Sequence, residues 1–579
     1  MSMMKESEPR LLAQSVFLGV IGALAAQLFM WALRICQHFF LIDLAGYTPP
    51  GLPEEGGVLR QLTGPHSLWL IPISTTLGGL LSGLLVYNLA PEAEGHGTDT
   101  VVKSFHRAGG FIRARVAPLK LVASAITIGS GGAAGREGPT ALIGAGVGSI
   151  YATLTRRPEE ERRILTLVGM AAGLSAIFRS PIGAAFFATE VLYGNMEFEA
   201  SALLYTMLAS VTAYAINGLF VGWRPLFYFT ASQSNLRAMD YAWLVALGGA
   251  SGLVATLLPV AFYRTRDAFR ALPCPRALHP AIGGLGVGLL ALKFPQVLGG
   301  GYGWIQEAMD GGLVMHLMII LLFTKIVAFA LTVSSGGSGG VFAPTLFVGA
   351  MLGGFCSSVS HLPSDMFVVL GMAATFGAAA RVPIASLVMV KEMTGGYRLL
   401  PPAAFVVLLS YLIQTRLAAN LKYNSLYEAQ VPGRAQSPAR YEENVQLALD
   451  LLGTHQIPQA AKIGHLDLVA LLDAGIPVQL PGGKKLDIGL LRPQSTLVGQ
   501  TIQSCYKAAD DGNFEVIAVL RAGEIILPTP DAVLQENDRL LVIGSKESRA
   551  KIAEYLAPST SPYSGAATPP RNPTKATPE

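Results

Sequence analysis

Long segments without a charged side chain constrain this chain more than any other feature. Residues 326–363 contain no Lys, Arg, Asp or Glu, and residues 11–35 contain a single charged residue, Arg34. A helix needs about 20 mainly apolar residues to cross the hydrocarbon core of a bilayer. The 579 residues are 51% hydrophobic and 14% charged, whereas soluble domains carry roughly 25% charged residues. We therefore predict an all-α polytopic membrane protein over residues 1–419.

The predicted apolar helices follow the same plan in two halves of the chain. Each half contains one glycine-rich break that leads through a proline into a short apolar helix. Short helices around such breaks are typical of transporters whose binding site lies where two internal repeats meet. The expected apolar segments are residues 11–35, 67–90, 116–128, 139–154, 165–177, 181–193, 200–223 and 241–263, then 281–292, 311–323, 326–363 (broken at 334–344), 366–380, 382–390 and 399–415.

The first break, residues 129–140, combines many glycines with a single carboxylate, Glu137. Pro139 suits the first turn of a helix, and a helix start offers unpaired N–H groups and a partial positive charge to an anion. A phosphate-binding loop is excluded because that motif ends in Gly-Lys-Ser or Gly-Lys-Thr, whereas Gly135 is followed by Arg136. Close packing of membrane helices is the other explanation of the glycines, and the second break makes it less favoured.

The two breaks and the plan of the chain resemble the CLC family of chloride channels and proton/chloride exchangers. Gly135-Arg-Glu-Gly-Pro139 matches the family's gating-glutamate motif, and Gly340-Val-Phe-Ala-Pro344 matches its second helix-start motif. The resemblance covers roughly residues 11–427. It implies inverted repeats, a homodimer with one pore in each subunit, and anion binding by helix N-termini.

The resemblance also implies roles for particular residues. Glu137 would gate the pore, because its carboxylate can occupy an anion site until protonation removes the charge. Tyr427 matches a tyrosine whose hydroxyl faces the anion. The implied anion-binding residues are Gly135, Arg136, Gly138, Val341, Phe342, Tyr427, His96 and Gly97.

The stretch Gly95-His-Gly-Thr-Asp99 departs from the family's usual Gly-Ser-Gly-Ile-Pro. His96 takes the place of a serine that helps to coordinate the ion, so it would add pH dependence near the anion path. A loop histidine that points to water is the alternative. Because the serine position bears on selectivity in the family, chloride is the default ion, and nitrate and fluoride remain open.

The family's exchangers usually carry a second glutamate that passes protons to the inner side. Alignment from Pro181 puts Val191 at that position and Glu190 at the preceding, more structural one. A valine cannot carry a proton, so the relay expected from Glu137 through Glu190 and Val191 is interrupted. This favours passive anion conduction, with proton-coupled chloride exchange as the alternative.

Residues 486–556 resemble the C-terminal domain of potassium-uptake regulators, of the RCK-C or TrkA-C type. We predict a small α/β domain that binds a small ligand or nucleotide, or that only dimerises. Its expected strands are residues 516–520, 524–527 and 539–543; a linker (420–485) with helices at 444–453 and 465–474 precedes it, and a disordered tail (557–579) follows it.

Other functions fit the sequence less well. The net charge of +4 argues against a nucleic-acid partner, and the four cysteines have no metal-ligand spacing. No nucleophile or metal cluster joins Glu137, which argues against an enzyme, and no filter of the Thr-Val-Gly-Tyr-Gly type indicates a potassium pathway. The expected partners are chloride or a similar anion, membrane lipid and a second copy of the chain. The basic residues 107–115 agree with an inner or plasma membrane location with a cytoplasmic C-terminal domain.

Overall fold

The chain forms two compact units, Met1–Gln436 and Ser437–Glu579. The computed structural model describes residues 2–52, 62–63, 68–229, 237–434 and 437–438, and from the second unit residues 478–479, 485–491, 495, 497–503, 514–521, 524–526, 532–544 and 556–558. The linker helices expected at 444–453 and 465–474, and the tail from residue 559, lie outside these ranges.

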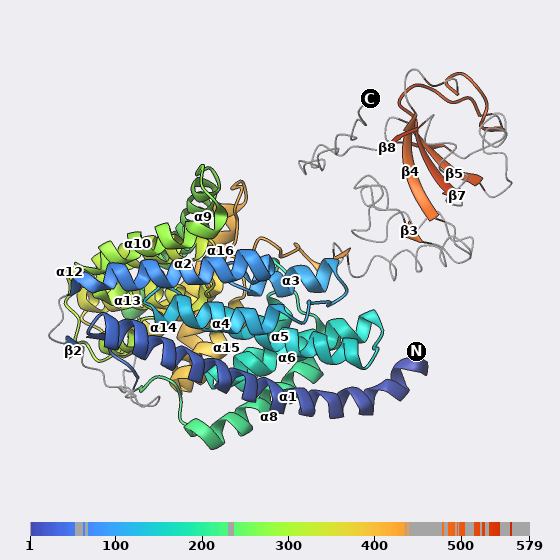
Figure 1. The fold of residues 1–579 in the computed structure, drawn as a ribbon. Coiled ribbons are helices and arrows are strands. Elements are labelled where there is room, and N and C mark those ends of the chain that lie inside the picture. The colour runs from blue at the N-terminus through green and yellow to red at the C-terminus, as the bar shows by residue number, and fades with distance from the viewer. Residues whose placement is uncertain are drawn as a thin grey trace, which may run out of the picture. The chain divides into compact units, whose positions relative to one another are not determined.

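The first half of the helical unit contains eight α-helices within the described ranges (Figure 1). They are α1 (Ser2–Gln37), α2 (Ile71–Leu89), α3 (Thr98–Arg107), α4 (Val116–Gly129), α5 (Glu137–Leu154), α6 (Glu159–Phe178), α7 (Pro181–Glu190) and α8 (Ala200–Val221). A π-helical segment, His38–Leu44, extends α1, and the short strands β1 (Tyr47–Thr48) and β2 (Leu62–Thr63) pair antiparallel.

The second half contains eight helices in the same order of long and short elements. They are α9 (Asp240–Arg270), α10 (His279–Ala291), α11 (Tyr302–Met309), α12 (Met315–Ser334), α13 (Phe342–Ser360), α14 (Ser364–Ala379), α15 (Pro383–Thr394) and α16 (Leu400–Ala418). α1 packs along α6 and α8, and α9 packs along α14 and α16 in the same way. The packing therefore supports the predicted repeat, and α9 opens the second half rather than closing the first.

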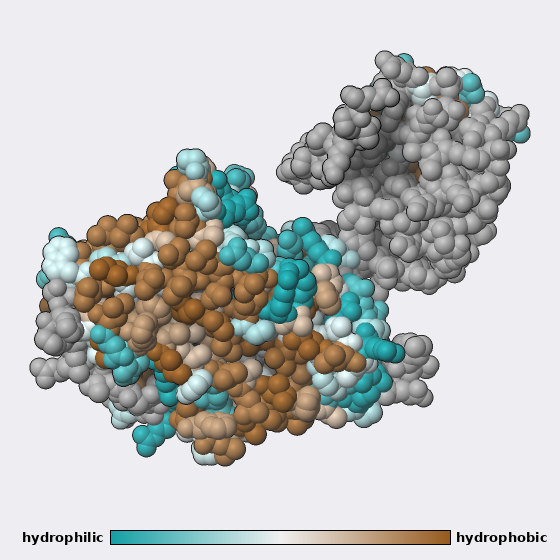
Figure 2. Space-filling model, viewed as in Figure 1, coloured by the Kyte–Doolittle hydropathy of each residue, from teal (hydrophilic) through white to brown (hydrophobic). Residues whose placement is uncertain are grey.

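The helical unit presents an apolar surface to its surroundings. Among the described residues, seven helices are long and apolar enough to cross a membrane. Figure 2 shows hydrophobic side chains over most of the visible face of this unit. Large apolar side chains such as Trp31, Leu204 and Leu219 are more than half exposed. Such a surface fits lipid rather than water, as expected for a multi-pass membrane protein.

Two parts of the fold differ from the sequence prediction. α12 runs without a break through Lys325, where we expected one apolar segment to end and another to begin. The ammonium group of Lys325 is fully buried and donates hydrogen bonds to the carbonyls of Val297 (2.8 Å) and Gly299 (2.7 Å). Because the charge is solvated by protein carbonyls, the helix continues past it. The short helices α3 and α11 were also not predicted, since their length and polarity give no span pattern.

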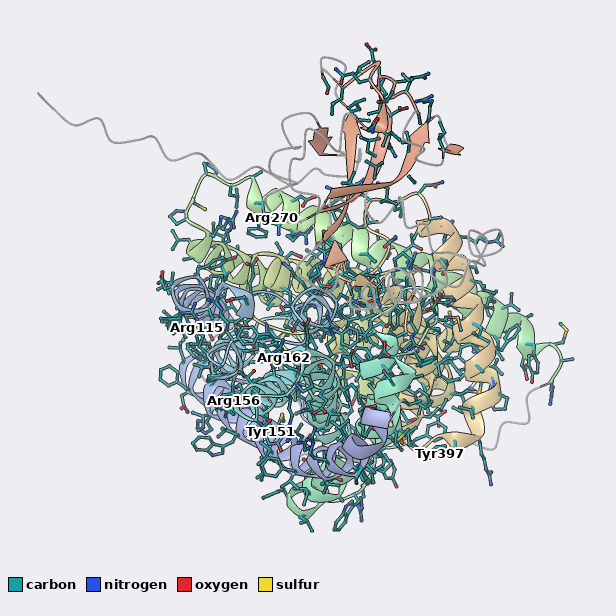
Figure 3. The ribbon with its side chains drawn as sticks, turned by 90° about the vertical axis from the view of Figure 1, so that its right-hand side faces the viewer. Arg115, Tyr151, Arg156, Arg162, Arg270 and Tyr397 are labelled. Atoms are coloured by element: carbon teal, nitrogen blue, oxygen red, sulfur yellow. The ribbon has the colours of Figure 1, made fainter. Side chains whose placement is uncertain are left out.

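Arginines gather at one end of the helical unit. Figure 3 looks onto this end and labels Arg115, Arg156, Arg162 and Arg270. The first three flank the start of α4, the end of α5 and the start of α6, and Arg270 is the last residue of α9. An excess of Arg and Lys marks the cytoplasmic side of membrane proteins.

The second unit contains an antiparallel sheet. Its strand order is β3 (Val478–Gln479), β4 (Lys485–Leu491), β7 (Arg539–Gly544), β5 (Phe514–Arg521) and β6 (Glu524–Ile526), and β8 (Leu556–Pro558) pairs with β4. The three predicted strands are therefore confirmed as β5, β6 and β7. Arg521, the last residue of β5, donates two hydrogen bonds of 2.8 Å to the buried carboxylate of Asp538, the residue before β7.

Candidate functional site

The site is built where the starts of α5 and α13 meet inside the helical unit. The N–H of Gly135 donates to the carbonyl of Gly340 (2.7 Å), and the N–H of Gly340 donates to the carbonyl of Gly135 (2.6 Å). A Cβ on Gly340 would press against the backbone of Gly135 and Gly138, so this close approach requires glycine. The pairing brings two helix N-termini, with their unpaired amide groups and partial positive charges, to one place.

Glu137 is the first residue of α5 and is almost completely buried. Its Oε1 accepts a hydrogen bond from the hydroxyl of Tyr302 and lies 3.8 Å from Nε of Arg136. Its Oε2 lies against Gly135, where an added Cβ would collide with it. The carboxylate therefore folds back over the start of its own helix.

Phe342 occupies the equivalent position at the start of α13. Its ring packs 4.0 Å from the ring centroid of Phe376 and 4.3 Å from that of Phe178. A small cavity of about 10 Å³ separates Phe342 from Glu137, and Thr98, Val341 and Tyr427 are among its other lining residues. This volume is close to that of a single water probe, so the space between the two helix starts is almost completely filled by protein atoms.

Tyr427 lines the small cavity, and His96 packs next to Tyr427. The His96 ring lies 5.4 Å from the ring of Tyr427 and 6.1 Å from that of Phe262. Its Nδ1 accepts a long hydrogen bond (3.5 Å) from the N–H of Asp99, so the other ring nitrogen carries the proton of the neutral imidazole. His96 is 7% exposed, which excludes a loop histidine that points freely to water.

Gly97 and Gly138 make the close approaches around this ring. Gly97 is the residue before α3 and has φ of +83°, a conformation that favours glycine. A Cβ on Gly138 would meet the carbonyl of His96, and a Cβ on Gly97 would meet the carbonyl of Gly138. The sequence-predicted residues of both motifs are thus brought together with Tyr427, although they come from four separate segments of the chain.

A larger cavity of about 640 Å³ begins at His96 and Gly97. Its basic lining residues belong to the arginine-rich end of the unit and to α9; they are Lys103, Arg107, Arg113, Arg266 and Arg270, and the acidic ones are Glu92, Glu94 and Asp99. A wide, charged cavity on one side of the narrow site gives an ion a wet approach to it.

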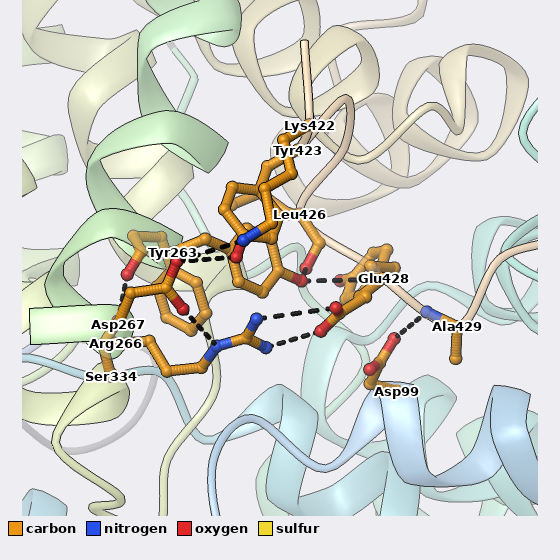
Figure 4. Close-up of polar contacts among 12 residues, drawn as sticks. Asp99, Tyr263, Arg266, Asp267, Ser334, Lys422, Tyr423, Leu426, Glu428 and Ala429 are labelled. Carbon is orange, nitrogen blue, oxygen red and sulfur yellow. Dashed lines mark hydrogen bonds and ion pairs between the residues drawn. The ribbon is translucent and has the colours of Figure 1, made fainter. Parts of the chain in front are cut away.

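The segment that carries Tyr427 is anchored beside this cavity (Figure 4). Arg266 pairs with Glu428 at 2.5 Å, and the N–H of Ala429 donates to Asp99 at 2.8 Å. Tyr263 donates to the carbonyl of Leu426 at 2.9 Å. Burial raises the pKa of the Asp99 carboxyl to about 6, and the hydrogen bond from Ala429 opposes part of that rise.

Arg136 turns away from the small cavity. Its guanidinium lies over the ring of Tyr302, 4.8 Å from the centroid, and Nη1 is 3.6 Å from the sulfur of Met30. With Arg34 and Arg179 it lines a small crevice that is separate from the cavity between the helix starts. Its side chain therefore contacts the site through Glu137 and Tyr302.

Glu190 and Val191 lie apart from the residues lining the small cavity. The Glu190 carboxylate accepts hydrogen bonds from the N–H groups of Ile384 (3.2 Å) and Ala385 (2.6 Å) at the start of α15. Glu392 at the end of α15 accepts in the same way from the start of α7. Each carboxylate caps the other repeat's helix, and Val191 is a buried apolar residue.

Sequence reasoning missed three residues next to the site. Tyr302 contacts Glu137 directly, and the buried ammonium groups of Lys120 and Lys325 hold the turns before α3 and α11. The two lysines could have been identified from the sequence, because an ionisable residue in an apolar helix indicates a specific partner. For Tyr302 the only local sign was the run of three glycines before it.

The geometry suits a small anion that enters and leaves. Amide N–H groups and hydroxyls supply partial positive charge without a full charge at the ion's position, which permits release. Among the residues that the structure describes, no group of three or more His, Cys, Asp or Glu side chains is placed to hold a metal ion. These features are those of a polytopic membrane protein in which two helix starts meet at a buried candidate site.

Comparison with known proteins places the chain within this class. It matches the family described as "Voltage gated chloride channel" over residues 78–415, and the TrkA-C domain over residues 490–557. The chain belongs to this voltage-gated chloride channel (CLC) family and carries a C-terminal TrkA-C domain.

Similar proteins come from several bacteria. The chain is 30% identical over 429 residues to the voltage-gated ClC-type chloride channel ClcB of Salmonella dublin, covering 72% of this chain and 98% of the relative. It is 29% identical over 427 residues to ClcB of Escherichia coli O81, with the same coverage.

Two solved structures share the fold. A CLC-type fluoride/proton antiporter gives a TM-score of 0.61 at 24% identity and covers 73% of this chain and 98% of its own. A slow cyanobacterial Cl⁻/H⁺ antiporter gives 0.63 at 22% identity, with 72% and 96% covered. At these identities the likeness concerns the fold alone, the predicted all-helical CLC architecture.

Proposed function

We propose that the protein transports chloride across the membrane through the site between α5 and α13, and that Glu137 gates it. The observation that carries the proposal is the position of Glu137. Glu137 is the first residue of α5, close to the start of α13, and it lines the small cavity together with residues of both helix starts. Protonation removes the charge that competes with the anion, so a lower pH on the accessible side opens the path.

The anion-binding groups in this proposal are the backbone amides at the two helix starts and the hydroxyl of Tyr427. Val341 and Phe342 contribute amides from α13, and Gly138 contributes one from α5. His96 takes part through its ring N–H at the border with the larger cavity. Because the two relatives above are both described as chloride channels, chloride is the proposed ion.

We further propose passive conduction rather than proton-coupled exchange. Val191 stands where the resemblance implies a proton-relay glutamate, and the Glu190 carboxylate is occupied in capping α15. The second candidate is a chloride/proton antiporter, which is favoured by the two structural neighbours, since both are described as antiporters.

A flux assay in liposomes tests the gate. Glu137→Gln keeps the shape of the side chain and removes its titration, so we expect anion flux that no longer responds to pH between 4 and 8. Glu190→Gln serves as the matched control, because it removes a buried carboxylate that is not among the residues lining the small cavity, and its flux should keep the pH response of the parent. A retained pH response in Glu137→Gln would contradict the gate.

Reversal potentials distinguish the two transport modes. Under a pH gradient at equal chloride, a passive conductance gives a reversal potential of about zero, whereas coupled exchange shifts it toward the proton gradient. Parallel runs with nitrate and fluoride replacing chloride establish the ion preference. A proton-dependent shift would support coupled exchange in place of passive conduction. It would not contradict the gating role of Glu137.

For the TrkA-C domain we propose regulation by a small ligand or nucleotide. The match over residues 490–557 supports this role, and a dimerisation role without a ligand is the alternative. Deletion of residues 486–556 should change the flux response to added nucleotides, measured with purified protein in vesicles. Unchanged flux together with an unchanged oligomeric state would exclude both roles. The arginine-rich end supports a cytoplasmic position for the chain that leads to this domain.

A further inference from the structure

Tyr302 is the residue that meets the proposed gate from the opposite repeat. It is the first residue of α11, and its hydroxyl donates a hydrogen bond to Oε1 of Glu137. The bond joins residues 165 positions apart, and no motif of the sequence analysis includes Tyr302. A donor aimed at the carboxylate stabilises its ionised form.

The phenol ring of Tyr302 packs against two side chains. The Arg136 guanidinium lies over it at 4.8 Å from the centroid, and the Phe227 ring lies 5.9 Å away. Arg136 therefore contacts both partners of the hydrogen bond, since its Nε is 3.8 Å from Oε1 of Glu137. The three side chains form one polar cluster, in which Arg136 and Glu137 are buried (6% and 1% exposed) and Tyr302 is half-buried.

The turn before Tyr302 is fixed from within the protein. Gly301 precedes it with φ of +81°, and Lys325 Nζ donates to the carbonyls of Val297 and Gly299 in the same turn. Nζ of Lys325 also lies 4.8 Å from the ring centroid of Phe347. A buried ammonium that satisfies two carbonyls leaves the turn little freedom, so the phenol is delivered to a defined position.

The first half of the helical unit contains an equivalent turn, also held by a buried lysine. Gly97 precedes α3 with φ of +83°, and Lys120 Nζ donates to the carbonyls of Ala93 (3.0 Å) and Gly95 (2.6 Å). Thr98, the first residue of α3, lines the small cavity together with Tyr427. Each lysine-held turn thus precedes a helix whose first residue carries a hydroxyl: Tyr302 donates to Glu137, and Thr98 lines the small cavity.

We propose that Tyr302 is a positioning residue that latches Glu137 in the anion site and so sets the pH at which the path opens. This inference rests on the proposed gating role of Glu137. When Glu137 is ionised, the phenol donates to the carboxylate and holds it between the helix starts. When Glu137 is protonated, the attraction of a charged acceptor is lost, and the side chain leaves the site more readily.

The test is the pH dependence of chloride flux in Tyr302→Phe. This change removes one oxygen and keeps the ring between Arg136 and Phe227. Without its donor the carboxylate holds a proton more readily, so we expect the pH of half-maximal flux to rise by about 1 pH unit, a tenfold change in proton affinity. The matched control is Tyr47→Phe, another buried tyrosine, whose hydroxyl faces the carbonyl of Pro295; its midpoint should equal that of the parent.

The double variant Glu137→Gln/Tyr302→Phe separates latching from packing. If Tyr302 acts through the carboxylate, its change should alter flux less than twofold in the Glu137→Gln background. An equal loss of flux in both backgrounds, or an unchanged midpoint in Tyr302→Phe, would overturn the latch. Tyr302→Leu provides a second variant in case Phe is not tolerated, with the same expected shift.

The two proposals fail in different ways. If Glu137 is not the gate, Glu137→Gln alone keeps a pH response. If Glu137 is the gate and the latch is absent, Glu137→Gln is independent of pH and Tyr302→Phe has the midpoint of the parent.

Discussion

The two halves of the helical unit share one scaffold and differ in the side chains placed on it. Glu137 and Phe342 are the first residues of α5 and α13, and each follows its glycine by two positions. Lys120 and Lys325 hold equivalent turns, and Glu190 and Glu392 cap each other's helices. The scaffold residues are alike because both halves need the same backbone. The residues facing the cavity differ because only one titratable group is needed there.

This comparison distinguishes residues that support the fold of both halves from residues that make the two halves differ. A charge repeated in both halves, as with the two lysines, serves the turn that it holds. A charge present in only one half, as at Glu137, has no structural counterpart and marks the place where the halves act differently. The same rule draws attention to Tyr302, whose counterpart Thr98 is a much smaller hydroxyl residue.

The largest effect should come from breaking the contact between the halves. In Gly340→Ala the added Cβ would meet the backbone of Gly135 and Gly138, which cannot move without opening both helix starts. We expect a loss of more than about 3 kcal/mol, comparable with overpacking in a core, and flux reduced at least 100-fold. In Gly135→Ala the Cβ would first meet the end of the Glu137 side chain, so the loss should be smaller. Thermal unfolding in detergent measures the stability of the two variants, and flux in liposomes measures their transport. Equal losses in Gly340→Ala and Gly135→Ala would contradict this prediction.

Next in size is the removal of either buried lysine. Lys120→Met and Lys325→Met each leave two carbonyls without their charged donor, at a cost of about 2–3 kcal/mol. The two losses should be similar, because the two hydrogen-bonded turns are alike. The pH of half-maximal flux distinguishes the two variants. Because only Lys325→Met disturbs Tyr302, only this variant should shift that pH. A shift in Lys120→Met alone would reverse this assignment.

A smaller effect is expected from the reciprocal caps. Glu190→Gln and Glu392→Gln keep acceptors for the amides at the starts of α15 and α7 but lose the charge that favours a helix N-terminus. Each should cost about 1 kcal/mol in thermal stability. The reversal potential under a pH gradient should be the same in both variants and in the parent. If the reversal potential changed only in Glu190→Gln, Glu190 would belong to a proton pathway.

The last effect, which depends on pH, concerns Asp99, which has no acidic counterpart at the start of α11. Its pKa in the folded protein is raised to about 6, so the fold binds a proton there more tightly than the unfolded chain does. The stability that this proton gives is complete below the ordinary pKa near 3.9 and is lost as the pH rises through 6. Because about two pH units separate the two pKa values and one unit corresponds to about 1.4 kcal/mol, Asp99→Asn should be more stable than the parent by up to about 3 kcal/mol at pH 8, and the difference should nearly vanish at pH 4. Thermal melts at the two pH values check this, and a difference that grows toward pH 4 would contradict it.

Much of the architecture could be predicted because it depends on local pattern. Glycine-rich breaks followed by Pro139 and Pro344 led to the two helix starts, and strands β5, β6 and β7 followed from short runs of apolar residues. The prediction failed at α12, where Lys325 looked like the end of a span. A charged residue in an apolar helix has two meanings, and only its partners decide between them.

The sequence by itself determined which segments are apolar enough for a membrane, where helices break, and that Glu137 stands alone among glycines. Those properties belong to neighbouring residues, whose periodicity and conformational limits are readable along the chain. Only the tertiary structure decided that Gly135 pairs with Gly340 and that Tyr302 donates to Glu137. Each of these contacts joins residues well over a hundred positions apart, and such a pairing depends on how whole helices pack.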